Sequence, residues 1–310
     1  MNVLITTSSF GIQDSTVFDP LLLFDLNYKT NPFGRALSEE EALELYSITK
    51  PNGIIAGTEP ITKQVINAIP ELKVISRAGT GTGNVDHEAA AEKGILIFNT
   101  PEAPALAVAE LTIGLILSVL RHISFSDRML REGLWKKTMG NLLFKKTVGI
   151  AGCGHIGKAT AGLLKAFGCH VIGYDPFINK TADFKIVSDK EELLHRSDII
   201  TLHMPLTSKT NNFINDEALH KMKKDSILIN AARGGIVDEK ALLRHLESGH
   251  LAGAALDTFE KEPYSGGPLA QLKNVVLTPH IGSYASESRI RMERESVDNL
   301  IKGFKQQGLI

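Results

Sequence analysis

Cysteine is scarce in this chain. Its 310 residues include only Cys153 and Cys169, and these two form neither a CxxC pair nor another spacing typical of a zinc site or a disulfide framework. We therefore expect two free thiols, which fit a reducing, cytoplasmic environment, and we expect no metal site.

The chain also lacks a charge excess and a long apolar run. Its 34 basic and 35 acidic side chains nearly cancel, to a formal net charge of −1. Because a strongly basic chain is what favours nucleic acids or anionic membranes, neither is an expected partner. The longest apolar stretch, residues 103–120, contains Pro104 and Glu110, whereas a membrane-spanning helix needs about 20 apolar residues, so a buried core helix is expected. Met1–Thr7 lacks the charged start and apolar core of a signal peptide and is typical of a first strand.

The most informative stretch is a glycine-rich turn. An apolar run, Val148–Ala151, leads into Gly152, Gly154 and Gly157, and a helix-forming segment follows directly. Strand, tight turn and helix in this order bring backbone N–H groups and the positive end of a helix dipole to one point, where a pyrophosphate can bind. A second predicted strand ends in Asp175, 18 residues past Gly157, which is about where a carboxylate accepts hydrogen bonds from the adenosine ribose. Together these features predict a dinucleotide site.

The first hundred residues alternate strand and helix patterns. Short apolar runs of strand length lie at 3–6, 53–56, 73–76 and 95–98, and helical segments begin near Ser38, Pro60 and Asp86. Such alternation favours a parallel sheet covered by helices on both faces. A last helical segment, 286–304, has no strand of its own and is expected to pack back on this first domain.

The second half repeats the alternation more regularly. Predicted strands lie at 148–151, 171–174, 199–203, 227–230, 252–256 and 275–277. Six strands with helices between them predict a doubly wound sheet in the order 3-2-1-4-5-6, whose ligands bind at the carboxyl edge. The residues just past these strands, which this edge would gather, are Gly152, Asp175, Pro205, Arg233, Asp257 and His280.

The domain boundary is predicted at Asn99–Pro104, where two prolines interrupt the strand pattern and a single long helix begins that runs to about Arg131. We therefore expect an α/β fold of two doubly wound parallel-sheet domains. A Rossmann-type cofactor domain, 99–282, would be inserted in a flavodoxin-like substrate domain, 1–98 plus 283–310.

A second unusual turn follows a strand of the first domain. The segment Arg77-Ala-Gly-Thr-Gly-Thr-Gly83 is either a flexible loop or an anion-binding loop. In the second case Arg77 and the N–H groups around Ala78 and Gly79 would face a ligand carboxylate. Its place after a parallel strand favours the anion-binding loop.

An arginine, a histidine and acidic residues follow the predicted strands of the second domain, and these are side chains that suit hydride transfer from a nicotinamide cofactor. Hydride transfer to a carbonyl requires a group that holds the substrate and a group that exchanges a proton with its oxygen. Arg233 suits a carboxylate because its fork donates two parallel hydrogen bonds. His280 follows a strand and precedes a turn, and histidine exchanges protons near neutral pH. Either Glu262 or Asp257 could orient the imidazole from its far nitrogen.

At this point several motifs, in order, resemble the D-isomer-specific 2-hydroxyacid dehydrogenases. The matching segments are Gly152-Cys-Gly-His-Ile-Gly157, His203-Met-Pro-Leu206, Asn230-Ala-Ala-Arg-Gly-Gly-Ile-Val-Asp238, Ala254-Ala-Leu-Asp257, Glu262-Pro263 and Pro279-His-Ile-Gly282. The resemblance covers essentially the whole chain. Arg77–Gly81, Asn84–Asp86 and residues 103–120 are most similar to the D-3-phosphoglycerate dehydrogenase branch, here in a short form without the C-terminal regulatory domains.

The resemblance implies residue roles. Arg233 would bind the substrate carboxylate and carbonyl, His280 would be the acid/base, and Glu262 would pair with His280; Arg77, Ala78 and Gly79 would contact the substrate. The cofactor would be NAD, because Asp175 accepts ribose hydroxyls and repels a 2′-phosphate. The residues implied to line NAD are Thr80, from the other domain, Gly152, Gly154, His155, Ile156, Gly157, Asp175, His203, Met204, Pro205, Ala231, Ala232, Asp257 and Gly282.

The family further implies domains that close on the substrate and a homodimer built on the cofactor domain. The expected activity is hydride transfer between NAD(H) and a small D-2-hydroxy acid or 2-keto acid, with 3-phosphoglycerate and 3-phosphohydroxypyruvate as one candidate pair, as in serine biosynthesis. Phosphoglycerate enzymes tend to carry an arginine in the loop that here reads Ala56–Pro60, and Lys136 and Lys137 could supply the charge instead. The alternatives are a glyoxylate, hydroxypyruvate or other 2-keto acid reductase and, in another class, an NADH-sensing interaction protein.

Overall fold

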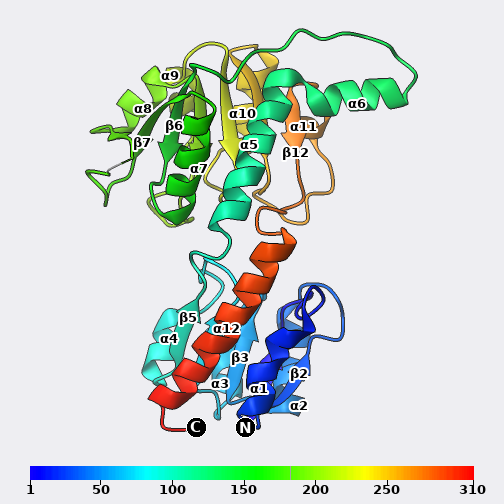
Figure 1. Ribbon diagram of the computed structural model, residues 1–310, viewed down its shortest axis with the longest axis vertical. Coiled ribbons are helices and arrows are strands. Elements are labelled where there is room, and N and C mark those ends of the chain that lie inside the picture. The colour runs from blue at the N-terminus through cyan, green and yellow to red at the C-terminus, as the bar shows by residue number, and fades with distance from the viewer. Residues whose placement is uncertain (182) are drawn as a thin grey trace. The chain divides into compact units, whose positions relative to one another are not determined.

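The computed structural model describes residues 1–181 and 183–310 and divides into two compact units (Figure 1). Unit 1 comprises Met1–Pro104 and Tyr284–Ile310, and unit 2 comprises Ala105–Ser283. The substrate role expected of the first domain and the cofactor role expected of the second stay predictions.

Unit 1 contains a five-stranded, wholly parallel sheet. Its strands are β1 (Asn2–Ile5), β2 (Asn27–Thr30), β3 (Gly53–Ala56), β4 (Val74–Arg77) and β5 (Leu96–Asn99), in the order β2-β1-β3-β4-β5. This is the flavodoxin-like order. The sequence pattern did not predict β2, because this edge strand is polar and largely exposed and so shows no apolar run.

The helical elements of unit 1 include the C-terminal helix that was expected to pack back on the first domain. They are η1 (Ser15–Phe18), α1 (Asp19–Leu23), α2 (Glu39–Thr49), α3 (Lys63–Ala68), α4 (His87–Glu92) and α12 (Ser286–Gln306). A capping box between Ser38 and Glu41 begins α2, as the sequence indicated. The last helix, α12 (red in Figure 1), packs on β3, β4 and β5 and buries Leu300 and Phe304 completely.

Unit 2 contains a seven-stranded parallel sheet. Its strands are β6 (Thr147–Ala151), β7 (His170–Tyr174), β8 (Lys185–Ile186), β9 (Ile199–Leu202), β10 (Ser226–Asn230), β11 (Leu251–Leu256) and β12 (Val275–Leu277), in the order β12-β11-β10-β9-β6-β7-β8. The α/β class and the doubly wound topology are thus confirmed. The expected strand order was wrong for one strand: β9 lies next to β6, and the outer third position belongs to β8, whose two residues are too short to give a pattern.

The helices of unit 2 are α5 (Ala105–Arg121), α6 (Ile123–Arg131), α7 (His155–Ala166), α8 (Lys190–Arg196), α9 (Asp216–Lys221), α10 (Glu239–Glu247) and α11 (Pro268–Gln271). The single helix expected from residue 104 to about Arg131 is in fact two, because His122 takes a left-handed conformation with φ 53°. Before this break α5 packs on α7 and on β10–β12, whereas α6 has no buried residue. In Figure 1 α6 and the segment after it extend outward from the rest of unit 2.

A membrane-spanning helix was not expected in this chain. Among the described residues no single helix is both long and apolar enough to cross a bilayer; α5 and α6 would pass only as a pair, which is bent by 64°.

Candidate active site

The glycine turn after β6 has the shape that the sequence indicated. Gly152 has φ 94°, and a side chain there would clash with the His203 carbonyl. A Cβ at Gly154, by contrast, would meet no atom within 4 Å, so the turn is open on that side. Gly154 also begins α7 without a side-chain cap among the described residues. The N–H groups at an open helix N-terminus point outward along the helix axis and fit a pyrophosphate. His155 and Ile156 form the first turn of that helix.

Asp175 follows β7 beside this turn. Its Oδ2 accepts a hydrogen bond from the Cys153 N–H at 2.9 Å, and its Oδ1 accepts one from the Phe177 N–H at 2.9 Å. The carboxylate is thereby held next to the glycine turn, where the ribose of a dinucleotide would be expected.

His203, Met204 and Pro205 follow β9 at the same edge. The His203 backbone N–H donates to the Ala151 carbonyl at 2.7 Å, and its Nε2 lies 3.0 Å from the Thr201 hydroxyl. Burial lowers the pKa of His203 to about 3, so its imidazole is neutral near pH 7 and unsuited to proton exchange there.

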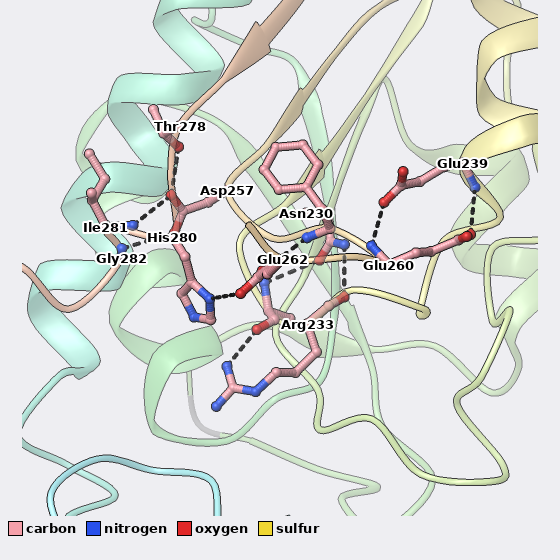
Figure 2. Close-up of polar contacts among 12 residues, drawn as sticks. Asn230, Arg233, Glu239, Asp257, Glu260, Glu262, Thr278, His280, Ile281 and Gly282 are labelled. Carbon is pink, nitrogen blue, oxygen red and sulfur yellow. Dashed lines mark hydrogen bonds and ion pairs between the residues drawn. The ribbon is translucent and has the colours of Figure 1, made fainter. Parts of the chain in front are cut away.

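Arg233 is presented by a turn that Asn230 shapes. Asn230, the last residue of β10, donates from Nδ2 to the Arg233 carbonyl at 2.9 Å and accepts from the Ala232 N–H at 3.1 Å (Figure 2). Ala231 and Ala232 are buried, while the guanidinium itself is half-buried and donates to the Ala232 carbonyl at 2.6 Å. Burial lowers the pKa of Arg233 and the nearby Glu262 carboxylate opposes that effect; arginine nevertheless stays charged in proteins.

His280 lies on a turn that is held in place by hydrogen bonds to the Asp257 carboxylate. The Asp257 carboxylate, 1% exposed, accepts from the Thr278 hydroxyl at 2.6 Å, from the Ile281 N–H at 2.9 Å and from the Gly282 N–H at 2.8 Å. Between these donors His280 has φ 55°, a backbone conformation that side-chain-bearing residues rarely adopt. The buried carboxylate therefore imposes the turn that points the imidazole away from the sheet.

Glu262 is the acid that pairs with His280. Its Oε2 lies 2.8 Å from the imidazole Nδ1, and its Oε1 accepts from the Phe259 N–H at 3.1 Å. Burial alone would raise the pKa of Glu262, but hydrogen bonding and charge from His280, the Phe259 N–H and the Arg233 charge together lower it, so the carboxylate is ionised at neutral pH. With Nδ1 turned to Glu262, the imidazole presents Nε2 on its other side. The positions of the strands had left Glu262 and Asp257 open for this role, and the family resemblance had implied Glu262.

The three residues come together in unit 2. Glu262 hydrogen-bonds His280 and attracts Arg233 electrostatically, so an acid, an imidazole and a guanidinium form one cluster (Figure 2). Such a cluster can bind a carboxylate and exchange a proton with an adjacent oxygen. Within the described residues no group of three or more His, Cys, Asp or Glu side chains is arranged to hold a metal ion.

The Arg77 loop belongs to unit 1. Arg77 ends β4 and is buried, and its guanidinium donates to the Ala78 carbonyl. The Gly79 N–H donates to the Thr100 hydroxyl at 2.8 Å, and the Thr80 carbonyl accepts from the Asn99 side chain at 2.7 Å. These bonds tie the loop to the segment that ends β5; its expected contacts with substrate and cofactor stay predictions.

Comparison with known proteins decides the family. A model of the D-isomer specific 2-hydroxyacid dehydrogenase NAD-binding domain matches residues 113–282, more than half of the chain. The chain belongs to this family. It is 44% identical over 259 residues to a D-3-phosphoglycerate dehydrogenase of Methanocaldococcus jannaschii, a match that covers 82% of this chain and 49% of the relative. The chain thus spans about half the length of the curated relatives it matches.

Solved structures of family members agree over the whole chain. A glyoxylate reductase from Paecilomyes thermophila superposes with a TM-score of 0.86 at 31% identity, covering 99% of this chain and 96% of that one. A D-lactate dehydrogenase from Aquifex aeolicus, complexed with NAD and lactic acid, gives 0.83 at 27% identity, covering 100% and 96%. The family and fold expected from the motifs are confirmed, and the glycine turn is that of the family's NAD-binding domain.

Some residues that shape the site had no role in the sequence analysis. Asn230 lies inside a quoted motif, yet only the structure shows that its amide holds the Arg233 turn. Thr278 and the N–H of Phe259 act through contacts that no spacing rule predicts. A buried polar residue at the end of a strand, such as Asn230, is the one signal that could have pointed to such a role.

The Asp257 turn generates a prediction. In Asp257→Ala the Thr278 hydroxyl and two N–H groups lose their acceptor. If His280 is the predicted acid/base, we expect kcat/KM for a 2-keto acid to fall by about tenfold or more, because the turn that orients it is disrupted. Thr258→Val is the matched control, because the neighbouring Thr258 hydroxyl is buried and has no hydrogen-bond partner in the described part of the chain. Steady-state kinetics with NADH measure both variants, and equal loss in the two would contradict the role of Asp257.

Proposed function

We propose that this chain transfers a hydride between NAD(H) and a small D-2-hydroxy acid or its 2-keto acid. The observation that carries the proposal is the 2.8 Å contact between His280 Nδ1 and Glu262 Oε2, with the Arg233 guanidinium attracted to the same carboxylate. Family membership supports it, because the named relatives act on hydroxy acids or keto acids of this kind.

Three residues of the chain would have separate roles in the reaction. Arg233 would hold the substrate carboxylate with its two parallel N–H donors and set the position of the adjacent carbonyl. His280 would donate the proton on Nε2 to the carbonyl oxygen during reduction and accept it back during oxidation. Ionised Glu262 would keep Nδ1 protonated and the ring in place. NADH, when bound at the glycine turn, supplies the hydride itself.

Several substrates are compatible with these roles of Arg233 and His280. The phosphoglycerate dehydrogenase relatives favour the 3-phosphoglycerate and 3-phosphohydroxypyruvate pair, and the glyoxylate reductase and lactate dehydrogenase structures favour an unphosphorylated 2-keto acid. All share the carboxylate and carbonyl that Arg233 and His280 would engage, so the side group distinguishes them.

A substrate screen tests the proposal. We expect NADH oxidation with at least one of 3-phosphohydroxypyruvate, glyoxylate, pyruvate, hydroxypyruvate and oxaloacetate. On the best of these, His280→Ala should lower kcat by roughly 10²–10⁴-fold, the usual contribution of a general acid. Arg233→Ala should chiefly raise KM for the keto acid, because the carboxylate loses its forked partner.

His195→Ala is the matched control, since His195 is an exposed histidine on α8 of the same unit. If His280→Ala and Arg233→Ala turn over like His195→Ala, the assigned site is wrong. NADH binding without turnover of any keto acid would instead favour the NADH-sensing interaction protein.

The cofactor preference is expected to follow from Asp175. Its carboxylate would accept the ribose hydroxyls of NAD and repel the 2′-phosphate of NADP. We predict a KM for NADPH at least about tenfold above that for NADH, and a smaller ratio in Asp175→Asn, whose amide oxygen still accepts a hydrogen bond but carries no charge. Asp225→Asn, an exposed acid in the same unit, should leave the ratio unchanged. Equal KM values for the two cofactors in the wild type would contradict this assignment.

A homodimer through unit 2 is the proposed assembly. On α6 and the segment after it, large apolar side chains face solvent in one stretch of the chain: Ile123, Leu130, Leu134, Trp135, Met139, Leu142 and Phe144. Burial of such side chains stabilises an interface by about 1.5–3 kcal/mol each when complete. A second copy of the same segment is the occupant that the family resemblance implies.

Sedimentation measures the assembly. We expect the wild type to sediment as a dimer and Leu130→Asp, at a side chain that is 56% exposed, to sediment as a monomer, because a buried unpaired carboxylate opposes association. Phe177→Asp is the control, since Phe177 is 90% exposed on a different loop of unit 2. A dimeric Leu130→Asp variant would exclude α6 from the interface.

A further inference from the structure

Glu262 comes from a loop that needs support from outside itself. The residue lies past β11 in an irregular segment, and its side chain is 38% exposed. Yet its carboxylate meets His280 at 2.8 Å, a contact that requires the loop to keep one conformation. Part of the support comes from Gly234, where any side chain would clash with the Phe259 carbonyl.

The rest of the support comes from the start of α10. The Glu260 N–H donates to Glu239 Oε1 at 2.6 Å, and the Glu239 N–H donates to Glu260 Oε1 at 3.2 Å, so the two residues bind each other's backbone (Figure 2). Glu239 is the first residue of α10, behind the Asp238 cap. Since α10 packs on β11, Glu239 connects the loop to the regular part of unit 2 at a point two residues before Glu262.

Glu239 is also placed unfavourably for its charge. Burial raises the pKa of its carboxyl, and the charges of Glu260 and Glu262 raise it further. Three carboxylates thus gather here, and Arg233 and, when protonated, His280 act on Glu262 among them. An acid kept in such surroundings is better explained by its hydrogen bond to the loop than by its charge.

We propose that Glu239 is a positioning residue that fixes the Glu262 loop through Glu260 and so holds the Glu262–His280 contact in its working geometry. This inference rests on the proposed dehydrogenase function for its kinetic consequences. The simpler explanation is that Glu239 only stabilises α10, as acids in the first turn of a helix do.

The chain offers a matched control for that explanation. Asp216 is the first residue of α9, behind the Asn215 cap, and its carboxylate pairs with Arg244 on the surface. Asp216→Ala therefore removes an acid from the same helical position without touching the Glu262 loop. Glu239→Ala removes both the charge and the acceptor, while Glu239→Gln keeps an oxygen that can accept the Glu260 N–H.

Two measurements on the full chain separate these variants. By hydrogen exchange, we expect amides in 259–262 to exchange about tenfold faster or more in Glu239→Ala, and at the wild-type rate in Glu239→Gln and Asp216→Ala. In kinetics on the best keto acid, Glu239→Ala should lose roughly tenfold in kcat with an unchanged KM for NADH, and Glu239→Gln should recover to within about threefold.

The outcomes bear on the two proposals separately. If Glu239→Ala matches Asp216→Ala in exchange and kcat, the positioning role is refuted. If Glu239→Ala does not fold, Glu239→Gln decides: a loss of about tenfold or more in kcat there, although the hydrogen-bond acceptor is kept, overturns the proposal. If the wild type reduces no keto acid, the proposed function fails, while the exchange comparison still decides whether Glu239 fixes the loop.

Discussion

The contact between Glu262 and His280 joins two loops of unit 2, and its geometry depends on how each loop is fixed. The Asp257 carboxylate fixes the His280 loop by accepting three hydrogen bonds from it. These three donors offset the cost of burying the carboxylate. Gly234 and Glu239 fix the other by close packing and by a backbone hydrogen bond. Glu262 and His280 can therefore stay partly exposed, at 38% and 39% of their side-chain surface, while the Asp257 carboxylate that fixes the His280 turn is buried.

In a doubly wound parallel sheet, ligands bind at the edge where the strands have their carboxyl ends. This rule explains how much of the site could be predicted from the sequence. Gly152, Asp175, Arg233 and His280 follow strands that all run in one direction, so locating the strands was enough to bring these residues to one edge. The error in strand order did no harm to that argument. Placing β9 beyond β7 instead of next to β6 changes which strands are neighbours but leaves every carboxyl end on the same side of the sheet.

What the sequence could not predict shares one physical cause. The strand positions alone left open whether Glu262 or Asp257 faces the imidazole, and they gave no sign that Glu239 meets Glu260, 21 positions away. Both contacts depend on how loops pack after the sheet has formed. The break at His122 is similar, since its left-handed backbone interrupts a pattern that otherwise reads as one helix. Apolar periodicity reports which face of an element is buried and carries no information on hydrogen bonds between loops.

The loop after β3 in unit 1 carries an acid where a positive charge could have stood. The loop after β3, where phosphoglycerate enzymes tend to carry an arginine, here contains Glu59, whose carboxyl is 1% exposed and accepts from the Thr6 hydroxyl and the Gly57 N–H. Burial raises the pKa of Glu59, but the group offers no positive charge in either protonation state. A phosphate needs cations or convergent N–H donors to offset its desolvation. A phosphorylated substrate would therefore have to be recognised by cations outside this loop, whereas an unphosphorylated 2-keto acid would need no more than the carboxylate and carbonyl contacts proposed for Arg233 and His280.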